Sequence, residues 1–144
     1  MARLFTRQLA EQGAAVCNGD TAHLKRAELL TGRVILRALD TPDATDVQIN
    51  YSFDRGRCTD FELTEAPAPA PFRDAPFVPV KDGLARVTAN YQTWTRLDKG
   101  AIEPADALKS DDYHIEANML LLVPLMQAVN SWTEKIRALP KTYD

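Results

Sequence analysis

The sequence has no long apolar segment and no run of basic residues. Its longest apolar stretch, Met119–Met126, is far shorter than the roughly 20 residues that a helix needs to cross a bilayer. The N-terminal residues lack the apolar core of a secretory signal. The 17 Lys and Arg and the 20 Asp and Glu are mixed along the chain, whereas a nucleic-acid-binding protein concentrates its cations on one face. We therefore expect a soluble, cytoplasmic protein that does not bind nucleic acid.

Cysteine and histidine are also scarce, with two residues of each, far apart in the sequence. None of them forms the spacings that hold a metal ion, so no metal site or cofactor is expected. Cys17 and Cys58 could form a disulfide in an oxidising compartment, but without an export signal we favour two reduced thiols. No nucleophile elbow, phosphate-binding loop or dinucleotide fingerprint is present. The sequence thus carries none of the common local signatures of an enzyme.

The composition and the first thirty residues predict one domain that begins with two helices. The chain has 144 residues, of which 45% are hydrophobic and 26% charged, so one domain over residues 1–144 can have a sizeable core. Phe5 and Leu9 lie one helical turn apart and Val16 lies two turns further on, which indicates an amphipathic helix. Asp20 is a suitable N-cap for a second, short helix that ends at Gly32.

Three strand signals follow the helices. Residues 33–39 are rich in Val, Ile and Leu. Residues 46–54 alternate between apolar and polar side chains, and so do residues 57–64. Arg55-Gly56 between them indicates a tight turn, because Gly accepts the positive φ that two-residue hairpins require. We predict an antiparallel meander with one solvent-exposed face.

A proline-rich segment separates these strands from the rest of the chain. Residues 65–80 contain five prolines, a density that favours extended, polyproline-like conformations. One interpretation is a stiff surface loop inserted into the domain. The other is a lid, because Phe72, Phe77 and Val78 are apolar residues that a solvated loop does not need. A turn then leads to a fourth strand over residues 84–89.

Beyond Asn90 the apolar period changes from two to about 3.6, which is typical of helices. A helix is predicted after Asn90 and a short helix at Pro104, followed by a brief strand over residues 113–117. The last helix should begin at Asn118 and carry one apolar stripe. Pro124 lies inside it and removes one intrahelical hydrogen bond, so we predict a kink or a late start there.

A loop and the end of the last strand carry a recognisable motif. The loop reads Gly, three residues, Pro, two residues, Ala, and an Asn follows the strand; these positions are Gly100, Pro104, Ala107 and Asn118. With the order of helices and strands, the motif resembles the sterol carrier protein type 2 domain. In that family the strand ends in Gly-Asn, and Ala117 replaces the Gly here. The resemblance spans most of the chain.

The resemblance implies an α+β fold: a five-stranded, mostly antiparallel sheet covered on one face by helices, with a long C-terminal helix. It also implies an apolar tunnel between the sheet and the last helices, which carries lipids, sterols or fatty acyl groups without a cofactor. The candidate ligand-binding residues are Trp94, Leu97, Leu108, Ile115, Met119, Leu122, Met126 and Val129. Ordinary packing is the alternative for each of them, since a helix on a sheet needs an apolar stripe whatever its function.

The other reactive side chains have structural explanations. His114 is expected on the solvent side of its strand, with no nucleophile or carboxylate placed beside it by a motif. His23 is expected on the surface of the second helix. Asp111-Asp112 indicates a solvated turn rather than a cation site. Cys17 has no basic neighbour in the sequence, so we predict a packed thiol at a helix end rather than a reactive thiolate.

These features predict a non-catalytic carrier of an apolar small molecule, namely a sterol, a fatty acyl chain or another lipid. The alternative is an accessory module of a lipid or isoprenoid-quinone pathway that binds a protein partner or forms a homodimer. A small enzyme is a third interpretation. A closed tunnel favours the carrier, and an exposed apolar groove favours the module. Transient membrane contact stays open, although no basic amphipathic helix favours it.

Overall fold

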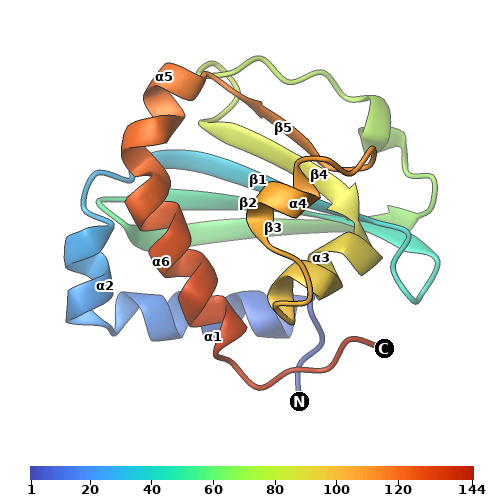
Figure 1. Cartoon of the computed structure of the whole chain (residues 1–144), viewed down its shortest axis with the longest axis horizontal. Coiled ribbons are helices and arrows are strands. Elements are labelled where there is room, and N and C mark those ends of the chain that lie inside the picture. Colours follow the sequence, from blue (N-terminus) through green and yellow to red (C-terminus); the bar gives the residue numbers. More distant parts are fainter.

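The computed structural model describes all of residues 1–144 and contains one five-stranded sheet with helices packed on one of its faces (Figure 1). The strand order is β3-β2-β1-β4-β5. β1 and β4 are parallel, and the other three pairings are antiparallel. The predicted mostly antiparallel sheet is therefore confirmed. Its strands are β1 (Gly32–Leu39), β2 (Thr45–Asp54), β3 (Arg57–Pro67), β4 (Ala85–Asn90) and β5 (His114–Ala117).

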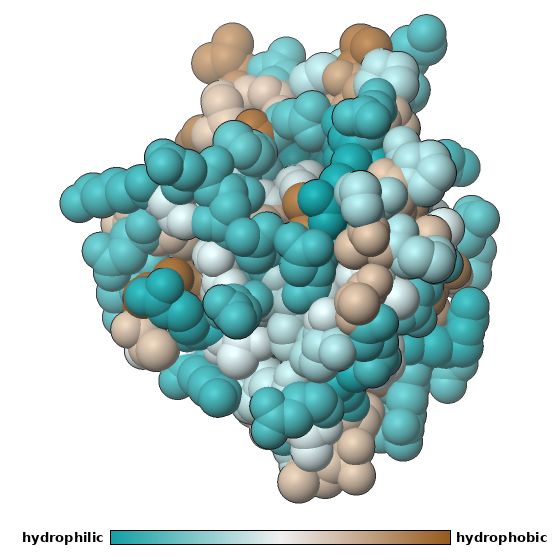
Figure 2. All heavy atoms as spheres, turned by 90° about the vertical axis from the view of Figure 1, so that its right-hand side faces the viewer, coloured by the Kyte–Doolittle hydropathy of each residue, from teal (hydrophilic) through white to brown (hydrophobic).

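Six α-helices and two 3₁₀ turns complete the fold. They are α1 (Arg7–Asn18), α2 (Thr21–Arg26), η1 (Pro71–Asp74), α3 (Tyr91–Asp98), α4 (Pro104–Ala107), α5 (Met119–Leu122), η2 (Val123–Leu125) and α6 (Met126–Arg137). The interruption predicted at Pro124 is confirmed, because this residue lies in η2 between α5 and α6. None of the helices has the length and apolar character needed to cross a bilayer. Figure 2 shows a largely hydrophilic face, with apolar side chains protruding at its upper end.

The hairpin between β2 and β3 is fixed by its turn. Arg55 and Gly56 both have positive φ, 51° and 85°, as the predicted two-residue turn requires. A Cβ on Gly56 would lie 2.7 Å from the carbonyl oxygen of Ala27, and the Gly56 N–H donates to Leu30 O at 2.8 Å. Gly is thus required both by the backbone conformation and by the close approach to the segment after α2.

The core lies between the sheet and the helices. The apolar residues that alternate along β2 are buried, as predicted, and belong to the same core as Trp132 of α6. The ring of Trp132 on α6 meets Tyr51 and Phe53 edge-on, with centroid distances of 5.4 and 5.0 Å. In α1 the buried face is centred on Gly13 and includes Leu9. The prediction for Val16 is wrong, because it lies at the edge of that face and is exposed.

The proline-rich segment covers the opposite face of the sheet. The ring of Phe72 lies over the guanidinium of Arg37, and the ring of Phe77 over that of Arg86, at 5.3 and 5.2 Å. The Arg86 guanidinium also donates to Ala75 O at 2.8 Å. Both arginines are buried. The face predicted to be solvent-exposed is therefore covered over β1 and β4, because cation–π contacts hold the segment on it.

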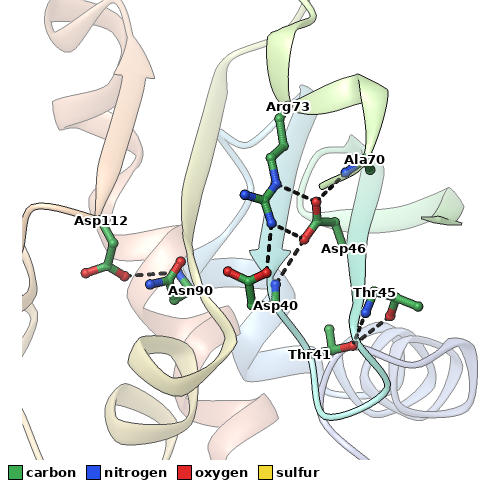
Figure 3. Close-up of polar contacts among 8 residues, drawn as sticks. All are labelled: Asp40, Thr41, Thr45, Asp46, Ala70, Arg73, Asn90 and Asp112. Carbon is green, nitrogen blue, oxygen red and sulfur yellow. Dashed lines mark hydrogen bonds and ion pairs between the residues drawn. The ribbon is translucent and has the colours of Figure 1, made fainter. Parts of the chain in front are cut away.

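Asp46 anchors this segment to the sheet (Figure 3). Its fully buried carboxylate accepts two hydrogen bonds from Arg73, at 2.5 and 2.7 Å, and further bonds from the N–H groups of Ala70 and Asp40, at 2.8 and 2.9 Å. Burial by itself would raise the pKa of Asp46. The hydrogen bonds outweigh it and lower the pKa, so the group is a stabilising carboxylate at neutral pH.

Asp112 caps the N-terminus of α3. Its carboxylate accepts hydrogen bonds from the Asn90 N–H at 2.9 Å and from the Thr93 hydroxyl at 2.7 Å, and Figure 3 shows the first of these. Asn90 stands at the N-cap position, but its own side chain makes no capping bond. Asp111 is exposed, as predicted for a solvated turn. The prediction is wrong for Asp112, which is half-buried because its carboxylate accepts hydrogen bonds from the first turn of α3.

Candidate functional site

A cavity of about 240 Å³ lies between the helix-covered face of the sheet and helices α1, α3 and α6. Of its 20 lining residues, 14 are hydrophobic, so its wall is apolar with few polar groups. The wall consists of Leu4, Phe5, Thr6, Leu9 and Ala10 at the N-terminus, Leu36, Ile49 and Tyr51 of the sheet, Trp94, Leu97, Asp98, Pro104 and Tyr113 in the middle of the chain, and Met126, Val129, Asn130, Trp132, Thr133, Ile136 and Arg137 of α6.

Trp94 forms a fixed part of the wall. Its indole N–H donates to the backbone oxygen of Arg37 at 2.8 Å, which ties α3 to β1. Its ring lies 5.3 Å from that of Phe5 and 6.0 Å from that of Tyr113. Because its polar N–H is satisfied by the sheet, the indole presents its apolar surface to the cavity.

The charged groups of the wall, Asp98 and Arg137, lie where α3 and α6 end. The carboxylate of Asp98 contacts Lys141 Nζ at 2.9 Å and accepts the Tyr143 hydroxyl at 2.6 Å, so the C-terminal residues compensate its charge. The guanidinium of Arg137 donates only to the backbone oxygen of Asp98, at 3.3 Å, and forms no ion pair. Arg137 is exposed, so this end of the cavity presents an uncompensated cation to solvent.

The structure separates the eight predicted ligand-binding residues into two groups. Trp94, Leu97, Met126 and Val129 line the cavity. The other four lie outside its wall: Leu108, Ile115 and Met119 are exposed, and Leu122 is buried at the start of the C-terminal helical segment. That these four residues contribute to ligand binding stays a prediction.

Several lining residues were missed by sequence reasoning, notably those of the N-terminal segment and α1. Leu9 lies on the apolar face of the predicted first helix, and Tyr51 on the apolar face of the strand predicted over residues 46–54. The same pattern arises whether an apolar side chain touches another side chain or an empty space. No local signal distinguishes the two.

Comparison with solved structures identifies the architecture. No protein-family model and no curated protein sequence matches the chain. A crystal structure of sterol carrier protein 2 superposes with a TM-score of 0.74 at 21% identity, over 96% of this chain and 100% of that one. The chain adopts the sterol carrier protein 2 fold. The resemblance noted in its loop and strand end is thus confirmed for the fold.

Two solution structures agree with this assignment. A conserved hypothetical protein of Thermus thermophilus, described as a candidate sterol carrier protein, gives a TM-score of 0.73 at 20% identity, over 100% of this chain and 94% of that one. The sterol carrier protein domain 2 of Helicoverpa armigera gives 0.55 at 11% identity, over 94% of this chain and 90% of that one. The sterol carrier protein 2 fold therefore extends over almost the whole chain.

A histidine–serine pair lies within the sterol carrier protein 2 fold, where α2 packs against α6. His23 was expected at the surface, but it is buried because this side of α2 faces α6. Its Nδ1 lies 2.7 Å from the Ser131 hydroxyl, to which Arg26 Nε also donates, at 3.3 Å. Nucleophilic catalysis uses such pairs. Here His23 Nε2 has no partner, so no carboxylate orients the ring as in a catalytic triad.

We expect His23 to make the protein less stable in mild acid. Burial lowers the pKa of His23 below its ordinary 6.5, so the unfolded chain takes up the proton first as the pH falls. The contribution of the neutral imidazole is complete above pH 6.5 and is lost progressively below it. The urea concentration at the unfolding midpoint should decrease when the pH is lowered from 7.5 to 5.5. It should decrease less in His23→Gln. An equal fall in that variant would contradict this explanation, and the exposed His114→Gln serves as the control.

Cys17 and His114 lie where the sequence predicted. Cys17 is fully buried at the end of α1, and burial raises the pKa of its thiol to about 12. The thiol is therefore protonated at neutral pH and is not a reactive thiolate. His114 is exposed on β5.

Proposed function

We propose that the chain binds an apolar small molecule in this cavity and carries it without chemical change. The observation that carries the proposal is the apolar cavity between the sheet and α6. Empty apolar space is unfavourable, because the side chains around it forfeit both transfer energy and packing contacts. A ligand that fills the space restores those contacts. The sterol carrier protein 2 fold supports the same conclusion.

The size and charge of the cavity favour an acyl chain over a sterol. Its volume of about 240 Å³ lies just below the range of roughly 300–1,000 Å³ that is usual for pockets of drug-sized ligands. An acyl chain can enter such a space with only part of its length, and each methylene that it buries contributes about 0.8 kcal/mol of binding free energy. A rigid sterol ring system fits only if the wall moves. The unpaired guanidinium of Arg137 is placed to meet an acidic head group at the rim.

Native mass spectrometry of the protein purified from its host, followed by organic extraction, tests the proposal. We expect a bound fatty acid or acyl compound, and an upward shift of the unfolding temperature when acyl ligands are added to the stripped protein. Sterols should give a smaller shift than fatty acids of similar apolar area. A ligand-free mass, together with no shift for any lipid class, would reject the carrier function.

A further inference from the structure

The start of the C-terminal helical segment is apolar, uncharged and exposed. No residue from Ala117 to Thr133 is charged, in a chain of which 26% is charged. The side chains of Met119, Leu120, Leu121 and Val123 are 53%, 87%, 48% and 59% exposed. We call these four residues the apolar tip. They lie in and directly after α5, which Figure 1 places at one end of the molecule.

The geometry of the tip indicates what covers it. Successive residues of a helix point about 100° apart, so Met119, Leu120 and Leu121 project in three directions that together span about 200°. Only Leu122 is turned inward and buried. A flat partner surface covers one side of a helix and leaves the other sides in water. A helix that is apolar all round belongs inside an apolar medium, and a lipid surface surrounds such a tip on every exposed side.

The charges of the chain specify the kind of lipid surface. The tip has no cation that would attract anionic head groups, and the whole chain has a net charge of −3, so anionic membranes repel it. The tip also continues into the candidate site, because Met126 at the start of α6 is both exposed and part of the cavity wall. We propose that the apolar tip inserts into zwitterionic lipid surfaces and so brings the cavity wall to the membrane.

Sedimentation with vesicles of phosphatidylcholine tests this docking surface. The wild-type protein should bind, and added salt should not weaken the binding, since the contact is uncharged. Leu120→Asp should reduce the vesicle affinity about tenfold or more, because a carboxylate is then forced into the lipid interface. Leu29→Asp is the matched control: Leu29 is also exposed, at 68%, but lies outside the tip, between α2 and β1. This control should bind as the wild type does.

Several outcomes would overturn the docking surface. These are wild-type protein that stays in the supernatant, Leu120→Asp that binds as the wild type does, or binding that requires anionic lipid. Light scattering that shows a dimer dissociated by Leu120→Asp would assign the tip to a second copy of the chain instead. Acyl-ligand binding by Leu120→Asp in solution should be unchanged, so the docking surface and the carrier function can fail separately.

Discussion

Replacing Val129 with Trp is expected to weaken binding of an acyl ligand about fifty-fold while the protein stays folded. Val129 lies on α6 and lines the cavity, and it is only partly buried, so the larger side chain can enter the empty space without displacing packed atoms. The indole would exclude about three methylene groups of the ligand. At about 0.8 kcal/mol each, the loss is about 2.4 kcal/mol, or about a fifty-fold rise in Kd. Titration with a fluorescent fatty acid measures it.

Val16→Trp is the matched control for this experiment. Val16 is an exposed valine of α1 outside the cavity wall, so the same substitution there should leave the Kd unchanged. The unfolding temperature of ligand-free Val129→Trp should equal or exceed that of the wild type, because the new side chain fills a void. Undiminished binding by a folded Val129→Trp would place the ligand outside the cavity.

The parts of the fold that the sequence predicts are those set by neighbouring residues. The alternation along residues 46–54 determines which face of β2 is buried, and Arg55-Gly56 determines the turn that follows. Pro124 interrupts the last helix for a reason that lies within one turn of it. The strand order, in which β4 lies beside β1 in parallel, has no local signal. It was predicted only as far as the resemblance to a known family implies it.

The candidate site could be predicted only in part, because an apolar pattern identifies side chains that avoid water without identifying what covers them. Trp94, Met126 and Val129 line the cavity. Met119 belongs to the same apolar segment, but it lies on the exposed tip. Tyr51 has the pattern of a core residue and yet lines the cavity. Whether such a residue meets protein, ligand or lipid depends on where the helices lie over the sheet.

Buried polar groups were the least predictable feature, since their partners lie far away in the sequence. The sequence around His23 has the pattern of a surface position, and its buried partner Ser131 lies 108 residues further along the chain. Asp46 likewise lies in a strand with ordinary alternation, and only the fold brings Arg73 to donate a hydrogen bond to its carboxylate. In both cases the burial follows from packing of distant segments, and the proline-rich segment supplies the second partner. That segment therefore has a role in stability that its composition alone does not indicate.

Asp46→Ala is expected to lower the free energy of unfolding by about 3 kcal/mol or more at neutral pH. The substitution removes the fully buried partner of Arg73 and leaves it only the exposed Asp40. The N–H groups of Ala70 and Asp40 lose their acceptor as well. The loss is a large fraction of the roughly 5–15 kcal/mol that stabilise a typical domain. Urea unfolding measures it, with the exposed Asp54→Ala of the same strand as the control.

The pH dependence distinguishes loss of the carboxylate interactions from a general packing defect. Because the pKa of Asp46 is lowered in the folded protein, its charge contributes stability that is complete above its ordinary pKa of 3.8 and is lost as the pH falls through the lowered value. The stability difference between wild type and Asp46→Ala should therefore shrink in strong acid. A stability difference that is constant from pH 7 to pH 2.5 would mean that Asp46 stabilises the fold by filling space rather than by its charge. The hydrogen bonds of its carboxylate would then not be what holds the proline-rich segment on the sheet.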